Sequence, residues 1–147
     1  MCSSDLVKGN HDFGTSNYLQ QLLARALSTG KYERRLGPLR TRYAQKARVM
    51  SEAVRAHFPS GIQWGEPRGG LYLWPKLPAG IKSGIKSRLF QTALERDVLY
   101  VPGELCYGDD PTRRKPNHEL RLSFGSASEA EIRTGIERLG AVLRVLL

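Results

Sequence analysis

The sequence has few of the residues that build metal sites or disulfide frameworks. Its only cysteines are Cys2 and Cys106, and His11, His57 and His118 each lack a second histidine one helical turn away. Neither a zinc site nor a disulfide framework is expected, and scarce cysteine fits a reducing compartment. Nothing near Cys106 supplies a base, so we expect a buried or half-buried structural cysteine rather than a nucleophile.

Long hydrophobic runs are also absent. No segment approaches the roughly 18 apolar residues that a membrane-spanning helix requires. The first residues, Met1 to Asp5, lack the basic-then-apolar order of a signal peptide. These absences predict a cytoplasmic protein with no membrane partner.

Positive charge is plentiful, with a formal net charge of +9 in 147 residues. Most arginines alternate with apolar positions in helical stretches, which is typical of solvated helix faces. The cluster Arg113-Arg114-Lys115 has no interleaved aromatic residues and no nucleic-acid-binding motif around it. We therefore expect no nucleic-acid partner. With 40% hydrophobic residues, the chain can bury the core of one domain.

Apolar spacing predicts two helices in the first part of the chain. One begins after a cap at Thr15 or Ser16 and stops near Gly30. The other has apolar residues three or four apart over residues 36–58, and Gly37-Pro38 predicts a kink or a late start.

The remainder is expected to alternate between strands and helices. Residues 62–64 and 70–74 suggest a hairpin, and a short helix follows a cap at Ser83 or Ser87. Residues 98–101 form a further strand, and the polar residues 107–118 form a surface loop. Ser128 and Glu131 make a capping box at the start of a closing helix whose apolar stripe runs to Leu146.

These elements predict an α+β fold. A small antiparallel or mixed sheet of about four strands has helices packed on one face and is preceded by a long connecting helix. In "NHELRLSFG", Leu120, Leu122 and Phe124 point toward the helices, and Arg121 points to the uncovered face. The alternation alone favours a solvated arginine, with an anionic ligand as the alternative.

Several segments, in order, resemble one known family. They are "PRGGLYLWPKLP", "VLYVPGELCY", "LRLSFG" and "EAEIRTGIERLGAVL", and the segments before residue 50 fit the same pattern. Together they look like the C-terminal small domain of fold-type I, class I/II, pyridoxal-phosphate (PLP) aminotransferases of the 2-aminoadipate, kynurenine and valine-pyruvate type. The resemblance implies a connecting segment and helix over residues 1–30 and the small domain over residues 31–147.

The resemblance implies roles for three residues. The arginine of the "LRLSFG" pattern, here Arg121, would bind the α-carboxylate of the substrate. Its planar guanidinium can donate two parallel hydrogen bonds to a carboxylate. Gly69 and Gly70 match a Gly-Gly pair that borders the substrate pocket in the family, where the absence of side chains permits close backbone approach. Asp97 occupies a position where the family commonly has glycine.

The same resemblance implies what is missing. The Schiff-base lysine and the residues that hold PLP lie in the large domain, so none has a counterpart here and no catalytic residue is assigned. The implied parent is a homodimeric PLP enzyme that transfers an amino group between an amino acid and a 2-oxo acid. This chain alone is expected to bind no PLP and to be inactive. Side-chain specificity would rest largely on the missing domain.

Two other hypotheses stay open. The domain resembles, nearly as well, the effector domain of transcription regulators that join a winged helix to an aminotransferase-like module. It could also be a free-standing module that binds a carboxylate or a partner protein through its uncovered sheet face.

Overall fold

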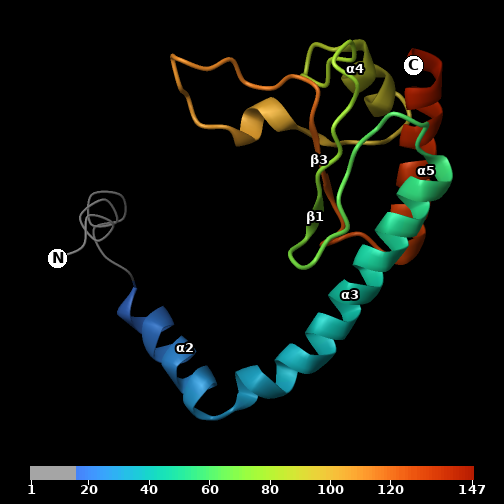
Figure 1. The fold of residues 1–147 in the computed structure, drawn as a ribbon. Coiled ribbons are helices and arrows are strands. Elements are labelled where there is room, and N and C mark those ends of the chain that lie inside the picture. The colour runs from blue at the N-terminus through green and yellow to red at the C-terminus, as the bar shows by residue number, and fades with distance from the viewer. Residues whose placement is uncertain (1–15) are drawn as a thin grey trace. The chain divides into compact units, whose positions relative to one another are not determined.

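The computed structural model describes residues 16–147, which divide between Thr41 and Arg42 into two compact units (Figure 1). Expectations for Cys2, His11, Thr15 and the N-terminal residues Met1 to Asp5 lie outside the described part. Within residues 16–147, no helix has both the length and the apolar character needed to cross a membrane.

The first unit contains helix α2 (Asn17–Ser28) and the beginning of helix α3 (Lys31–His57). Ser16 is the N-cap residue of α2, although its side chain makes no capping hydrogen bond. Gly30 separates the helices with a φ of +64°, a left-handed conformation that glycine adopts without steric cost. Helix α3 has no late start, because it begins at Lys31 and Pro38 lies inside it. No residue of α2 is buried.

The second unit is built on a three-stranded antiparallel sheet with strand order β1-β3-β2. The strands are β1 (Tyr72–Leu73), β2 (Val101–Pro102) and β3 (Leu120–Ser123). Residues 62–64 form no fourth strand. Only Gln63 pairs there, as an isolated bridge with Lys76 rather than with residues 70–74. The turn residues on one side and Pro75, which has no N–H to donate, limit the pairing to that single bridge.

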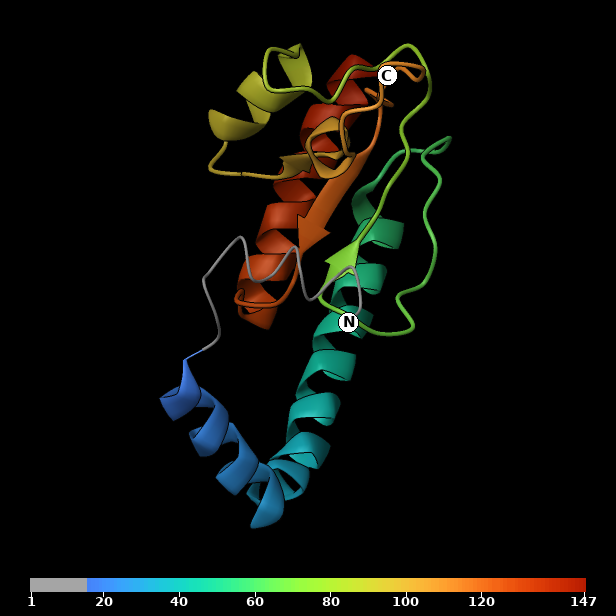
Figure 2. The same cartoon turned by 90° about the vertical axis from the view of Figure 1, so that its left-hand side faces the viewer.

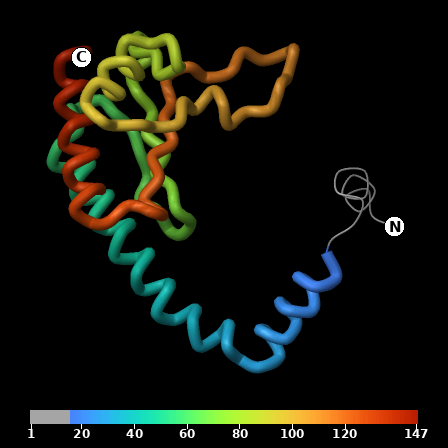
Figure 3. Tube along the Cα trace, turned by 180° about the vertical axis from the view of Figure 1, so that it is seen from behind, coloured from blue at the N-terminus to red at the C-terminus, as the bar shows by residue number. Residues whose placement is uncertain are grey.

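Helices cover one face of this sheet, as the sequence predicts. Helix α5 (Glu129–Leu146) and the second half of α3 lie side by side behind the strands in Figure 2, and Figure 3 shows the helices at the left, beside the strands. Helix α4 (Arg88–Leu94) packs against α5. The buried core draws on α3, α4, α5 and the strands, and Leu120, Leu122 and Phe124 are at most 5% exposed.

Local signals at the helix ends are confirmed. The Ser87 hydroxyl accepts a hydrogen bond from the backbone N–H of Phe90, which makes Ser87 rather than Ser83 the cap of α4. Ser128 and Glu131 form the reciprocal capping box at the start of α5. Asp97, three residues after α4, has a φ of +57°. This left-handed backbone explains why glycine would suit that position.

Candidate functional site

The face of the sheet away from the helices carries a set of polar and aromatic side chains. Along β3 the side chains alternate, so that Glu119, Arg121 and Ser123 point to this open face. The β1–β3 register pairs Tyr72 with Ser123 and Lys76 with Glu119, which places Trp74 opposite Arg121. On the other side of β3, Val101 pairs with Arg121. Arg121 therefore lies on the central strand, flanked on both sides.

Arg121 has no anionic partner among residues 16–147. Its guanidinium carbon lies 4.7 Å from the centroid of the Tyr72 ring, a cation–π contact. Its Nε atom is buried and has no hydrogen-bond partner within the described residues. By contrast, Arg133 and Arg138 on α5 pair with Glu52 and Asp97. A half-buried guanidinium with an unsatisfied donor is suited to an external anion.

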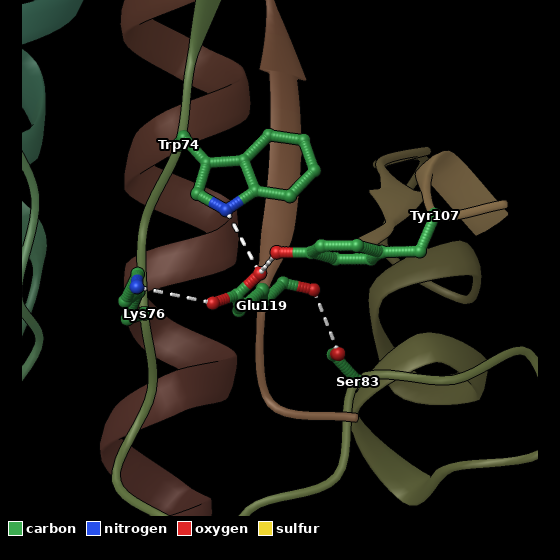
Figure 4. Close-up of polar contacts among 5 residues, drawn as sticks. All are labelled: Trp74, Lys76, Ser83, Tyr107 and Glu119. Atoms are coloured by element: carbon green, nitrogen blue, oxygen red, sulfur yellow. Dashed lines mark hydrogen bonds and ion pairs between the residues drawn. The ribbon is translucent and has the colours of Figure 1, made fainter. Parts of the chain in front are cut away.

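Two positions along β3 from Arg121, Glu119 lies at the centre of a polar cluster (Figure 4). Its Oε2 accepts hydrogen bonds from the indole N–H of Trp74 at 3.0 Å and from the hydroxyl of Tyr107 at 2.6 Å. Its Oε1 lies 3.3 Å from the ammonium of Lys76. The Trp74 and Tyr107 rings also meet edge to face, with centroids 6.3 Å apart. The cluster joins the strands to the start of the loop 107–118.

These contacts keep Glu119 ionised although its side chain is only 3% exposed. Burial by itself would raise the pKa of Glu119. The hydrogen bonds from Tyr107, Trp74 and Lys76, together with the positive charge of Lys76, outweigh burial and hold that pKa below its usual value. The hydrogen bond between Tyr107 and Glu119 also raises the pKa of Tyr107, because a phenol that donates to an anion ionises less readily.

A second polar group fixes the backbone beneath Glu119. The fully buried Ser83 hydroxyl donates to the carbonyls of Glu119 at 2.8 Å and Asn117 at 3.0 Å. Tyr100 donates to the Ser83 carbonyl at 3.0 Å, and burial raises the pKa of Tyr100 to about 12. Gly103 donates its N–H to the Glu119 carbonyl at 2.8 Å. A side chain at Gly103 would have its Cβ only 2.6 Å from Glu119 Cβ, so glycine is required for this close approach.

The expected glycine pair lies in the turn before β1. Gly70 has a φ of +74°, which strongly favours glycine. A Cβ placed on Gly69 or Gly70 would meet no atom within 4 Å. No other residue within 16–147 therefore approaches these glycines closely, and their proposed place beside a substrate stays a prediction.

The resemblance places the Schiff-base lysine of the family in a Ser-x-x-Lys type motif, so serine–lysine pairs with that spacing need to be located in this chain. The bare spacing occurs twice, at residues 28–31 and 83–86. The Ser28 hydroxyl donates to the backbone carbonyl of Arg25, and Ser83 is the buried residue described above. Lys86 is exposed just before α4. Neither pair forms a cofactor site.

The cysteine and histidine side chains of the described part lie outside the polar cluster. Cys106 is exposed in the short 3-10 helix η1 (Gly103–Cys106), so the expectation of a buried or half-buried cysteine is wrong. His57 and His118 are half-buried. In residues 16–147, no three His, Cys, Asp or Glu side chains gather as a metal site would require.

In the loop 107–118, the acidic residues make their contacts within the loop itself. Asp110 accepts hydrogen bonds from the backbone and side chain of Thr112. Lys115 forms an ion pair with Asp109 at 2.6 Å. The basic cluster is therefore partly neutralised within its own loop, which agrees with a surface role.

Sequence reasoning identified Arg121 but not the cluster beside it. Glu119 precedes Arg121 by two residues, so the same alternation places both on the open face. That signal was available in the sequence. The contribution of Tyr107 was not, because it depends on how the chain returns from η1 to the sheet.

The chain resembles known proteins in both sequence and structure. No protein-family model matches the chain. It is 31% identical over 140 residues to an uncharacterized aminotransferase of Saccharolobus solfataricus, covering 95% of this chain and 33% of the relative. It resembles the crystal structure of the α-aminoadipate aminotransferase LysN from Thermus thermophilus, complexed with N-(5'-phosphopyridoxyl)-L-leucine. The TM-score is 0.79 with 31% identity, covering 96% of this chain and 34% of that one.

The chain is a fold-type I aminotransferase-like domain. It spans about a third of the length of the curated relatives it matches. The aminotransferase-like domain is also 28% identical to the uncharacterized HTH-type transcriptional regulator YisV of Bacillus subtilis, over 96% of this chain and 27% of the regulator. Relatives therefore include both enzymes and regulators.

Proposed function

We propose that this aminotransferase-like domain is the small domain of a PLP-dependent aminotransferase and that Arg121 binds the α-carboxylate of the substrate. The proposal covers residues 31–147 as the small domain and residues 1–30 as the connecting segment. The observation that carries it is the unpaired guanidinium of Arg121 on the open face of the sheet. Similarity to aminotransferases over nearly the whole chain supports the same assignment.

The surroundings of Arg121 suit a carboxylate clamp. The Tyr72 ring covers one side of the guanidinium and restricts its motion. The buried Nε–H has no other acceptor among the described residues, so an incoming carboxylate would satisfy it. Two parallel hydrogen bonds would then fix the amino acid by the group common to all amino acids. Such orientation is worth a large part of a catalytic barrier.

The residues present fit the substrate and not the cofactor. When bound in the parent, PLP would supply the electron sink for chemistry at the substrate α-carbon. The serines of both Ser-x-x-Lys spacings donate to backbone carbonyls, and the guanidinium of Arg121 is not a nucleophile. We therefore assign no catalytic residue and propose that this chain alone is inactive. The missing large domain, the amino acid and 2-oxo acid substrates and a homodimeric, cytoplasmic parent belong to the same proposal.

Binding of an amino acid to Arg121 can be measured directly. We expect L-leucine to shift the Nε–Hε signal of Arg121 in ¹⁵N NMR spectra, because its carboxylate would accept that hydrogen bond. L-leucinamide, which lacks the carboxylate, is the matched ligand control and should leave the signal unchanged. Arg121→Lys serves to assign the signal. Equal shifts with both ligands, or none with leucine, would refute the proposed role of Arg121.

A second candidate function is the effector domain of a transcription regulator, favoured by the similarity to the Bacillus regulator. Both candidates use the same open face, so the domain alone does not separate them. The reading frame upstream of Met1 does. A Schiff-base lysine motif without a helix-turn-helix supports the enzyme, whereas a helix-turn-helix segment supports the regulator.

A further inference from the structure

Glu119 and Arg121 have opposite charges on the same face of β3, yet they form no ion pair in the structure. Side chains two residues apart on a strand are separated by roughly 7 Å, a distance that a glutamate and an arginine can bridge. Arginine readily pairs with a carboxylate within reach. Such a pair would occupy the donors that the proposed substrate carboxylate requires.

The contacts of Glu119 explain why that pair is absent. Oε2 already accepts from Trp74 and Tyr107, and Oε1 faces Lys76, whose positive charge compensates the carboxylate. Trp74 and Lys76 reach Glu119 from the β1 side, and Tyr107 reaches it from the opposite side, just after η1 (Figure 4). Because Gly103 has no side chain, the Glu119 side chain has room to lie over that position. The carboxylate is thus satisfied without turning to Arg121.

We propose that Trp74, Lys76 and Tyr107 hold Glu119 away from Arg121 and so keep the arginine available to an external carboxylate. The inference rests on the proposed function, because it assumes that Arg121 binds the substrate. The three donors are positioning residues that act through Glu119. Removing them would let the carboxylate of Glu119 compete with the ligand for the guanidinium.

The test is a set of variants of the whole chain. The double variant Lys76→Met with Tyr107→Phe removes the ammonium and the hydroxyl but keeps both side-chain volumes similar. Adding Glu119→Gln removes the competing charge. The matched control is Lys82→Met with Tyr32→Phe, which changes two exposed residues of the same types.

The first readout needs no ligand. In the double variant, Glu119 should accept from Arg121, and the Arg121 Nε–Hε signal should move downfield. Adding Glu119→Gln should return the signal toward its wild-type position. If the cluster only stabilised the fold, adding Glu119→Gln would not return the Arg121 signal toward its wild-type position. An unchanged Arg121 signal in the double variant overturns the proposal.

The second readout is the affinity for L-leucine. We expect it to fall about two- to fivefold in the double variant, the size of one partly exposed ion pair, and to recover when Glu119→Gln is added. The control variant should bind as the wild type does. Weaker binding that Glu119→Gln does not restore also overturns the proposal.

The two proposals fail in different ways. If wild-type protein does not bind leucine at Arg121, the proposed function fails. The ligand-free Arg121 signal still decides whether the three donors hold Glu119 away from Arg121. Should the double variant unfold, Lys76→Met alone carries the same prediction, because it removes the compensating positive charge with one exposed substitution.

Discussion

Replacing Gly103 with alanine should strain the contact on which the position of Glu119 depends. The new Cβ would lie 2.6 Å from Glu119 Cβ and 2.9 Å from the Glu119 carbonyl oxygen. Ordinary carbon contacts are about 3.5–4.0 Å, so the start of η1 and the backbone at Glu119 must separate by roughly 1 Å. That movement also weakens the 2.8 Å hydrogen bond from the Gly103 N–H to the Glu119 carbonyl.

The expected cost follows from two opposing effects. Overpacking a tight site costs about 1–3 kcal/mol. Alanine also restricts the unfolded chain, which offsets about 0.4–1 kcal/mol of that cost. We therefore expect Gly103→Ala to lower the free energy of unfolding by about 1–2 kcal/mol, and displacement of Glu119 should shift the NMR signal of the Trp74 indole N–H.

Urea unfolding at constant pH measures this change, provided that the m-value is unchanged. Gly65→Ala is the matched control, because a Cβ there would meet no atom within 4 Å and the backbone is not left-handed. The control should be as stable as the wild type or slightly more stable. If Gly103→Ala is equally stable and leaves the Trp74 signal in place, the close approach of Gly103 to Glu119 does not hold.

Three further changes test the buried polar groups. Ser83→Ala should cost about 1–2 kcal/mol of unfolding free energy in urea, because it removes a buried donor, whereas exposed Ser60→Ala should cost almost nothing. Burial raises the pKa of Tyr100 from 10.0 to about 12. The contribution of its protonated hydroxyl to the free energy of unfolding is therefore complete below pH 10 and is lost as the pH rises toward 12. That loss is about 3 kcal/mol, and Tyr100→Phe should abolish it; identical alkaline unfolding of both proteins would contradict the burial of this hydroxyl. The pKa of Glu119 lies below 4.5. The contribution of its carboxylate to the free energy of unfolding is therefore present above that pH and is lost as the pH falls through the lowered pKa. Glu119→Gln should therefore reduce the acid sensitivity of stability, and equal acid titrations would argue against an ionised Glu119.

The sequence predicted those parts of the fold that depend on local patterns. The alternation of Leu120, Leu122 and Phe124 and the Ser128–Glu131 capping box each rest on interactions within a few residues, and both are confirmed. The prediction of a strand over residues 62–64 was wrong, because only Gln63 pairs there, and it pairs with Lys76 rather than with residues 70–74. The exposure of Cys106 likewise depends on how η1 lies on the rest of the fold, which local patterns do not encode.

The candidate site was predictable only in part. Alternation placed Arg121 on the open face, but only the structure reveals that its Nε lacks a partner. Whether an exposed-face arginine is solvated, paired or free depends on the cross-strand neighbours and on Tyr107, which arrives from another part of the chain. These contacts are tertiary, and no spacing within the sequence specifies them.

The central claim, that Arg121 binds the α-carboxylate in a working aminotransferase, is tested most directly by kinetics in a hybrid enzyme. The hybrid replaces the matching third of the 2-aminoadipate transaminase of Thermus thermophilus with this chain. We predict that the hybrid transaminates and that Arg121→Lys lowers kcat/KM by about 100-fold, because lysine cannot donate in a bidentate fork. Arg114→Lys in the exposed loop is the control and should have no effect. An Arg121→Lys hybrid as active as that control, or a folded hybrid that does not transaminate, would contradict the account.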